Sequence, residues 1–297
     1  MNKPAYLILG CGFTGSRVAR LLAERGERVI VTTRTGRSEV AGVENVRLDS
    51  ADPETLRALY ERVPGGVRVL HSVPLAEGPS DPTPELLTAL YGKPQRMVYL
   101  STTGVYGATR DVDEKTRPAP RTPRERLRVQ AETAVAFAVR SSMILRPAAI
   151  YGPFRGVHAS VREGKFRLWG DGSNYVSRIH VDDLAALALA ALDSEATGAW
   201  PVADERPCES REIAEYCARL FSVPLPEPAP AALLSETRRA NRRVDGRAVC
   251  RVLGLTLRYP AYIAGIEACL RAEQAASKPV HSDDDGQQFQ TGTRSEE

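Results

Sequence analysis

A glycine-rich segment near the N-terminus has residue types and a spacing suited to binding phosphate groups. In LGCGFTGSRVA, the residues Gly10, Gly12 and Gly15 follow the G-x-G-x-x-G pattern between a strand-like apolar run and a segment with helical spacing. The first glycine permits a tight turn, the second lets a pyrophosphate approach the backbone, and the third lets the helix pack closely on the strand. Backbone N–H groups and the helix dipole then receive the phosphates. The segment therefore predicts a dinucleotide site, and an unliganded tight turn is the simpler alternative.

The residues that close the second strand indicate which dinucleotide binds. NAD-binding proteins usually place Asp or Glu there, which holds the ribose 2′-hydroxyl. Here the stretch reads Thr32-Thr33-Arg34, with Arg37 beyond it and no acid. A guanidinium can bind a 2′-phosphate that a carboxylate would repel, with a preference of about 1.5–3 kcal/mol. Arg34 therefore predicts NADP as the cofactor rather than NAD, and a solvated arginine at a strand end is the alternative.

Three arginines alternate in the stretch TPRERLRVQAE, which we expect to be helical. Arg124 and Arg128 share one helical face, whereas Arg126 does not, because neighbours on a face recur every three or four residues. The arginines could bind nucleic acid, form a solvated face, or belong to a catalytic site. The chain has 40 basic and 37 acidic side chains and a net charge of +3, whereas nucleic-acid-binding proteins usually show a concentrated basic stripe. Nucleic-acid binding is therefore the least favoured explanation.

The elements that must position these residues alternate along the first half of the chain. Strand-like segments are separated by stretches of helical length, and they lie at 5–10, 28–33, 45–49, 67–73, 96–102 and 142–147. This alternation predicts parallel strands with right-handed crossovers, which form a Rossmann-type doubly wound α/β sheet. This regular alternation of strands and helices ends after Pro147. We therefore expect a dinucleotide-binding Rossmann domain over 1–150, a smaller C-terminal substrate lobe over 151–274 with helices returning to the sheet, and a disordered tail over 275–297.

Composition narrows the class of protein. The 297 residues are 42% hydrophobic and 26% charged, as in a soluble globular protein with a substantial core. Five widely spaced cysteines without a CxxC pair fit a reducing compartment, and the four histidines have no metal-ligand spacing. The first apolar run is short and broken by glycine, which predicts neither a signal peptide nor a membrane span. We expect a cytoplasmic protein without a metal, with a small-molecule substrate and no nucleic-acid or membrane partner. The sequence leaves open whether the protein forms a homodimer.

Four further stretches carry a family resemblance, namely YLSTTGVYG (99–107), LRPAAIYGP (145–153), GDGS (170–173) and RIHVDDLA (178–185). With the glycine loop they make the chain resemble the extended short-chain dehydrogenase/reductase superfamily, of the NAD-dependent epimerase/dehydratase type, over nearly its whole length. The resemblance implies an NAD(P)-dependent oxidoreductase or epimerase. It also implies cofactor contacts position by position: Phe13 and Thr14 along the pyrophosphate, Asp49 at the adenine, Ser72 and Val73 at the turn after the fourth strand, and Pro147 and Ala148 beside the nicotinamide.

The resemblance also exposes a departure at the expected catalytic residues. The family transfers protons with a Tyr-x-x-x-Lys pair on the helix after the fifth strand. Alignment of the following Ala-Glu places Arg124 at the tyrosine and Arg128 at the lysine. A guanidinium has a pKa of at least ~12.5, so its deprotonation near pH 7 costs roughly 7–9 kcal/mol. Arg124 therefore cannot exchange protons as a tyrosine does, whereas Arg128 can still hold the nicotinamide ribose as a fixed cation.

Other positions indicate which reactions and substrates the expected active site favours. Thr102 stands at the family's catalytic Ser/Thr position, where it would donate to a substrate oxygen together with Arg124, or cap the end of the fifth strand. Tyr106 or a bound water would then supply the proton. Thr103 and Gly104 replace the Asp-Glu pair of sugar dehydratases, which disfavours dehydration. Val176 replaces the arginine that holds the diphosphate of a nucleotide sugar, which disfavours that class of substrate.

Two functions follow from these observations. The first is an atypical NADP-dependent oxidoreductase or epimerase that acts on a small polar carbonyl or alcohol, with NAD as the less favoured cofactor. The second is a non-catalytic NADP(H)-binding sensor or interaction protein, which kept the cofactor site and lost the proton-transfer pair. Turnover in the presence of NADPH separates the two hypotheses.

Overall fold

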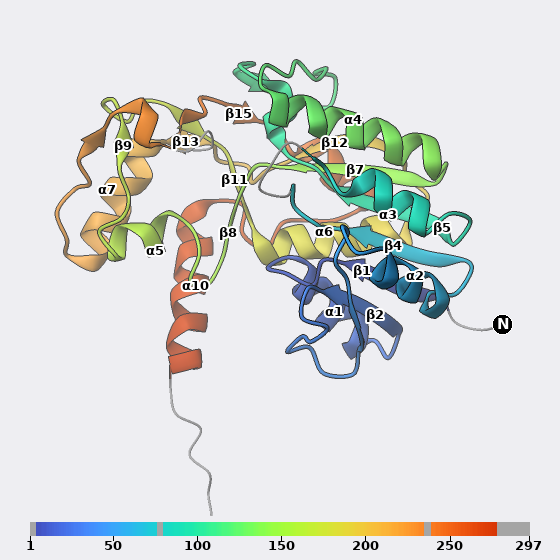
Figure 1. Ribbon diagram of the computed structural model, residues 1–297. Helices are drawn as coiled ribbons and strands as arrows, with labels where there is room; N and C mark the ends of the chain where they lie inside the picture. Colours follow the sequence, from blue (N-terminus) through green and yellow to red (C-terminus); the bar gives the residue numbers. More distant parts are fainter. Residues whose placement is uncertain (1–3, 76–79, 235–238, 278–297) are drawn as a thin grey trace, which may run out of the picture.

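The computed structural model describes residues 4–75, 80–234 and 239–277, and a seven-stranded parallel sheet forms its centre (Figure 1). The strand order is β12-β7-β5-β4-β1-β2-β3. Its strands are β1 (Ala5–Leu9), β2 (Arg28–Thr33), β3 (Glu44–Arg47), β4 (Val67–His71), β5 (Pro94–Leu100), β7 (Ser142–Pro147) and β12 (Gly198–Val202). This arrangement confirms the predicted doubly wound sheet. The order reverses between β1 and β4, which is where such sheets bind their ligands.

Helices cover both faces of the sheet, and alternate residues of β1 show which helices cover each face. Ile8 packs with residues of α1 (Gly15–Glu24), α6 (Val181–Asp193) and α9 (Arg247–Leu253) in one core cluster. Its neighbours Leu7 and Leu9 point to the opposite face. There they pack with residues of α2 (Pro53–Arg62), α3 (Thr83–Ala89) and α4 (Pro123–Ala138). In Figure 1, α1 and α6 lie on one side of the sheet, and α2, α3 and α4 lie on the other.

The C-terminal lobe has its own core, formed mainly by α5 (Val157–Arg162), α7 (Ser210–Phe221) and α10 (Tyr262–Ser277). Short strand pairs surround it: β8 (Ala149–Tyr151) with β11 (Arg178–His180), β9 (Leu168–Trp169) with β14 (Pro228–Ala229), and β10 (Tyr175–Val176) with β13 (Cys208–Glu209). A further pair, β6 (Asp111–Val112) with β15 (Arg243–Val244), joins the lobe to the connection between β5 and α4. The 3-10 turns are η1 (Thr103–Tyr106) and η2 (Ala231–Leu233).

Two features differ from the expectation for the C-terminal half. The strand β12 comes from within the expected lobe but pairs with β7 at the edge of the sheet, with Gly198 opposite Met143. Its Pro201 lacks an N–H group, which an edge strand tolerates. Because proline is rare within strands, this strand was not recognised in the sequence. The helix α10 continues to Ser277, so residues 275–277 of the predicted tail are helical. Their alanines favour helix continuation. The rest of that tail lies outside the described residues.

Candidate cofactor and active site

The glycine loop connects β1 to α1 at the carboxyl edge of the sheet. Gly10 has a φ of +85°, and a Cβ atom there would lie 3.1 Å from the amide nitrogen of Val73. A Cβ at Gly15 would collide with the carbonyl oxygen of Gly10, whereas a Cβ at Gly12 would meet no atom within 4 Å. The loop is held by Ser72, whose Oγ donates to the Gly10 carbonyl at 2.7 Å. Gly10 and Gly15 are thus required by the fold, and the open space at Gly12 is free for a ligand.

Phe13 in this loop lies between two arginines. The guanidinium carbons of Arg17 and Arg155 lie 4.4 and 4.9 Å from the centre of its ring. Arg17 also donates to the Phe13 carbonyl at 2.7 Å and to Asp182 at 2.8 Å. Because Arg155 belongs to the lobe, the stack ties the lobe to the loop. The adjacent Thr14 is buried at the start of the helix.

The residues expected near the adenosine lie in loops at the same edge. Arg34 follows β2 and is exposed, and no ion pair involves it within the described part of the chain. Asp49 is also exposed and lies two residues beyond the end of β3, rather than at the end of that strand. Its Oδ1 accepts a hydrogen bond from the amide of Ala51 at 3.0 Å. Arg34 is therefore available to a ligand, whereas one Asp49 oxygen is already engaged in a turn.

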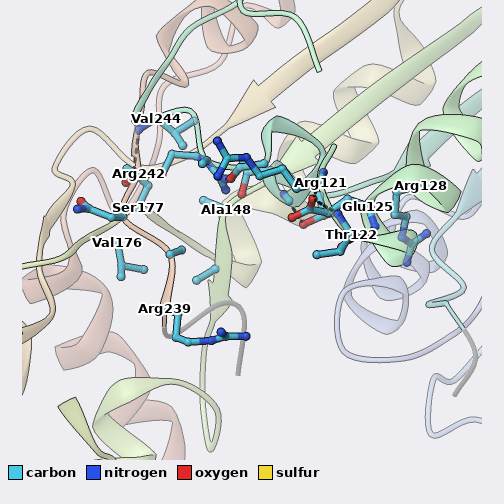
Figure 2. Close-up of a pocket in the computed structure, with 18 of the residues that line it drawn as sticks. Arg121, Thr122, Glu125, Arg128, Ala148, Val176, Ser177, Arg239, Arg242 and Val244 are labelled. Carbon is cyan, nitrogen blue, oxygen red and sulfur yellow. Dashed lines mark hydrogen bonds between the residues drawn. The ribbon is translucent and has the colours of Figure 1, made fainter. Parts of the chain in front are cut away.

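A cavity of about 740 Å³ lies between α4 and the C-terminal lobe. Its lining includes five of the residues predicted from the sequence: Thr102, Arg124, Arg128, Pro147 and Ala148. Thr102 both lines the cavity and accepts a hydrogen bond from the Gly104 amide at 3.1 Å. The capping role and the cavity-facing role proposed for Thr102 are thus compatible. Figure 2 shows Arg128 at one end of the cavity, and Arg239 and Arg242 toward the other.

Arg128 is a buried, fixed cation. One of its terminal nitrogens donates to the Tyr99 hydroxyl at 2.5 Å and lies 3.9 Å from Oδ2 of Asp81. Asp81 is held in turn by Thr83, whose amide and hydroxyl donate to Oδ1. Burial and the charge of Arg128 lower the pKa of the neighbouring His71 to about 3, so this imidazole is neutral. Sequence reasoning gave no role to Tyr99, whose motif was used only for the family resemblance, or to Asp81, a loop acid outside every motif.

The three alternating arginines of α4 have three different environments. Arg124 is exposed and lines the cavity, whereas Arg128 is buried. Arg126 is exposed outside the cavity lining, and it donates to the Arg121 carbonyl at 2.8 Å. The start of the helix is fixed by a capping box, in which Thr122 and Glu125 exchange hydrogen bonds with each other's backbone. A uniformly solvated basic face does not describe this arrangement.

Tyr106 does not lie where a proton donor to the substrate would have to be. Its side chain is fully buried and is not part of the cavity lining. Its hydroxyl accepts a hydrogen bond from Arg146 at 3.1 Å, and Arg146 binds Glu132 at 2.6 Å. The turn η1 directs this side chain inward, where burial raises its pKa. Of the two proton sources expected from the sequence, Tyr106 therefore does not reach the cavity.

Within residues 4–75, 80–234 and 239–277, no group of three or more histidine, cysteine or acidic side chains is arranged to hold a metal ion. No helix in that part of the chain combines the length and apolarity needed to cross a bilayer.

Comparisons with known proteins agree with the fold. The model of the NAD dependent epimerase/dehydratase family matches residues 6–202. A 2-alkyl-3-oxoalkanoate reductase of Stenotrophomonas maltophilia is 29% identical over 249 residues, which cover 72% of this chain and 74% of that protein. A 3-diazoavenalumate denitrifying reductase of Streptomyces sp. is 34% identical over 110 residues, and this match covers 35% of this chain and 36% of the relative.

Solved structures share the architecture. A conserved protein of unknown function from Silicibacter pomeroyi has a TM-score of 0.75 and 30% identity, covering 91% of this chain and 99% of that chain. The UDP-glucose 4-epimerase of Thermus thermophilus, solved in complex with NAD, has a TM-score of 0.77 and 23% identity, covering 92% and 99%. The second likeness concerns the fold. The family match and the reductase of Stenotrophomonas maltophilia indicate an enzyme of the oxidoreductase or epimerase type. The chain belongs to the NAD-dependent epimerase/dehydratase family.

Proposed function

We propose that the protein is an NADP(H)-dependent oxidoreductase or epimerase that acts on a small polar carbonyl or alcohol. The observation that supports this most is the cavity lining, which places Thr102, Arg124 and Arg128 beside Pro147 and Ala148 at the end of β7. The open space at Gly12 and the exposed Arg34 fit a dinucleotide with a 2′-phosphate. The five free cysteines favour a reducing, cytoplasmic setting.

In this proposal each side chain has one task. The bound nicotinamide cofactor supplies or accepts a hydride. The Thr102 hydroxyl and the Arg124 guanidinium donate hydrogen bonds to the substrate oxygen, which stabilises the charge that develops on it. Arg128, fixed by Tyr99 and Asp81, holds the ribose of the cofactor as a permanent cation. Because no arginine can exchange a proton near neutral pH, a water in the cavity delivers the proton.

Loss of NADPH absorbance at 340 nm, followed across aldehydes, ketones and sugar-derived carbonyls, tests the proposed activity. Turnover of at least one class is the expected result, and Thr102→Val should lower it. The competing function is a non-catalytic NADP(H) sensor, which the absence of the Tyr-x-x-x-Lys pair and the burial of Tyr106 favour. Tight NADPH binding without any turnover would support the sensor and remove the proposed activity.

Cofactor choice gives a further prediction. The parent protein should bind NADPH more tightly than NADH, and Arg34→Asp should reverse that order. The substituted carboxylate would bind a ribose 2′-hydroxyl and repel a 2′-phosphate, with an effect of about 1.5–3 kcal/mol. Calorimetric titration with both cofactors measures it. Arg57→Asp makes the same charge change on the exposed face of α2 and should leave the order unchanged. Equal affinities in the parent protein would contradict the role of Arg34.

The arginines of α4 should respond differently to truncation. Arg128→Ala should weaken cofactor binding by about 1.5–3 kcal/mol, because one charge-assisted hydrogen bond is lost. Arg124→Ala should leave cofactor affinity nearly unchanged and lower turnover, since this side chain faces the cavity. Arg126→Ala should be silent in both assays. Equal, small effects of all three substitutions on cofactor affinity and turnover would show that the arginines are only surface residues.

A further inference from the structure

The cleft contains many more cations than anions. Among the described residues, the cavity beside Thr102 is lined by one carboxylate, that of Glu125, and by six arginines: Arg110, Arg121, Arg124, Arg128, Arg239 and Arg242. A neighbouring cavity of about 460 Å³ shares Ala149, Trp169 and Val176 with it. Its lining adds Arg155, Arg167 and Arg178 and no acid. In a chain with a net charge of only +3, this concentration of positive charge is local to the cleft.

The single carboxylate does not pair with these arginines. Oε2 of Glu125 accepts hydrogen bonds from the backbone amides of Arg121 and Thr122, at 2.5 and 2.9 Å, and so completes the capping box of α4. Among the six arginines of the larger cavity, the described residues provide an ion pair only to Arg128, through Asp81. Apart from Arg128, the arginines of the larger cavity are therefore not paired directly with any acid of the described residues.

Arg242 is the buried arginine at this end of the cleft. The residue is only 9% exposed, and its guanidinium donates to two backbone carbonyls, those of Thr109 (3.1 Å) and Gly107. Burial lowers its pKa, and the carboxylate of Glu125 acts in the opposite direction without forming an ion pair with it. A buried cation without a directly paired counter-ion is costly to the fold. Because Arg242 lines the cavity, an anion bound there would pair with it.

Two exposed arginines complete this end of the cleft. The pairing of β15 with β6 places Arg242 beside the loop that contains Gly107 and Arg110, and the Arg243 amide donates to the Arg110 carbonyl. Arg121 packs against the same loop, because a Cβ at Gly107 would lie 3.3 Å from its Cγ atom. Arg121 and Arg242 thus approach, from two other segments of the chain, the loop that carries Arg110.

We propose that these three arginines bind an oxyanion of the substrate, a phosphate or a carboxylate, while the reacting carbonyl or alcohol lies at Thr102. This inference rests on the proposed function for the reaction itself. Guanidinium groups bind both oxyanions through paired, charge-assisted hydrogen bonds. Val176 stands where the resemblance implies the arginine for a nucleotide-sugar diphosphate, so the anion is held from other elements. The substrate class is an acidic or phosphorylated small carbonyl compound.

Calorimetry on the full chain saturated with NADP⁺ tests the anion site, because the phosphate-binding positions of the cofactor are then filled. The probes are inorganic phosphate, pyrophosphate and citrate. At least one should bind, and the double variant Arg110→Gln/Arg121→Gln should weaken it by at least about tenfold. Both side chains are exposed, so this variant avoids the buried Arg242. Arg140→Gln removes an exposed arginine just beyond the C-terminal end of α4, outside the cavity lining, and should change nothing.

The probes also distinguish the sources of the anion. Binding of phosphate or pyrophosphate alone assigns a phosphorylated substrate, and binding of citrate alone assigns a carboxylate. Absence of binding by all three probes, or binding that the double variant leaves unchanged, overturns the proposal. A separate titration with NADPH tests the proposed function. If the anion test fails while NADPH binding and turnover are intact, only the proposed substrate class is refuted. If a probe binds and the double variant weakens it, but NADPH does not bind, only the cofactor role is refuted.

Discussion

Gly15→Ala should abolish detectable NADPH binding, with a loss of at least about a hundredfold in affinity. The added Cβ would collide with the Gly10 carbonyl oxygen and lie 3.1 Å from both Ile8 Cγ2 and Ser72 Oγ. Backbone and buried strand atoms cannot yield cheaply, so either the loop or the start of α1 must shift. The phosphates would then lose the backbone N–H groups aimed at them. Fluorescence titration with NADPH measures the loss, and thermal unfolding should show reduced stability as well.

Gly12→Ala is the matched control for that result. A Cβ at Gly12 meets no atom within 4 Å, so the thermal stability of the free protein should stay near that of the parent. NADPH affinity should still fall, because the methyl group occupies the space that the pyrophosphate needs. Unchanged NADPH affinity in Gly12→Ala would show that the dinucleotide does not bind at this loop, whatever the effect of Gly15→Ala on stability.

Glu132→Ala should destabilise the protein by about 3–5 kcal/mol, because removal of one partner leaves a buried cation without compensation. Glu132 accepts hydrogen bonds from Ser101 at 2.6 Å and from Arg146 at 2.6 and 3.0 Å. Both charged residues are buried, and Arg146 also donates to the Tyr106 hydroxyl. Burial alone would lower the pKa of Arg146, but its bonds to Glu132 raise it. Urea unfolding followed by circular dichroism measures the free energy of unfolding.

Two further variants make this test specific. The double substitution Glu132→Leu/Arg146→Met removes both charges and should recover most of the stability, since apolar pairs of similar volume often replace buried ion pairs at little cost. Glu61→Ala breaks the exposed pair between Arg57 and Glu61 on α2 and should cost less than about 1 kcal/mol. A loss below about 1 kcal/mol in Glu132→Ala itself would show that the buried pair does not stabilise the fold.

The sequence predicted the features that depend on neighbouring residues. The spacing of Gly10, Gly12 and Gly15 encodes one turn between a strand and a helix, and the structure has that turn between β1 and α1. The six strand-like segments were recognisable because each is a short apolar run between helix-length stretches, and all six lie in the parallel sheet. The edge strand β12 was missed, because its five residues pack against β7 from far along the chain and carry no local pattern.

The environments of the individual site residues could be settled only by the tertiary structure. The sequence placed Arg124 and Arg128 on one helical face, but the packing of β5 and the loop at Asp81 buries one and leaves the other in the cavity. The same holds for Tyr106, which is buried in η1 outside the cavity lining.

The cationic end of the cleft is the clearest case. Arg242 reaches Gly107 across 135 positions of the chain, through the pairing of β15 with β6. The periodicity of side chains along one element is fixed by backbone geometry, and it can therefore be read from a few residues. Burial, charge pairing and the shape of a cavity depend on which distant segments meet, and only the folded chain decides that.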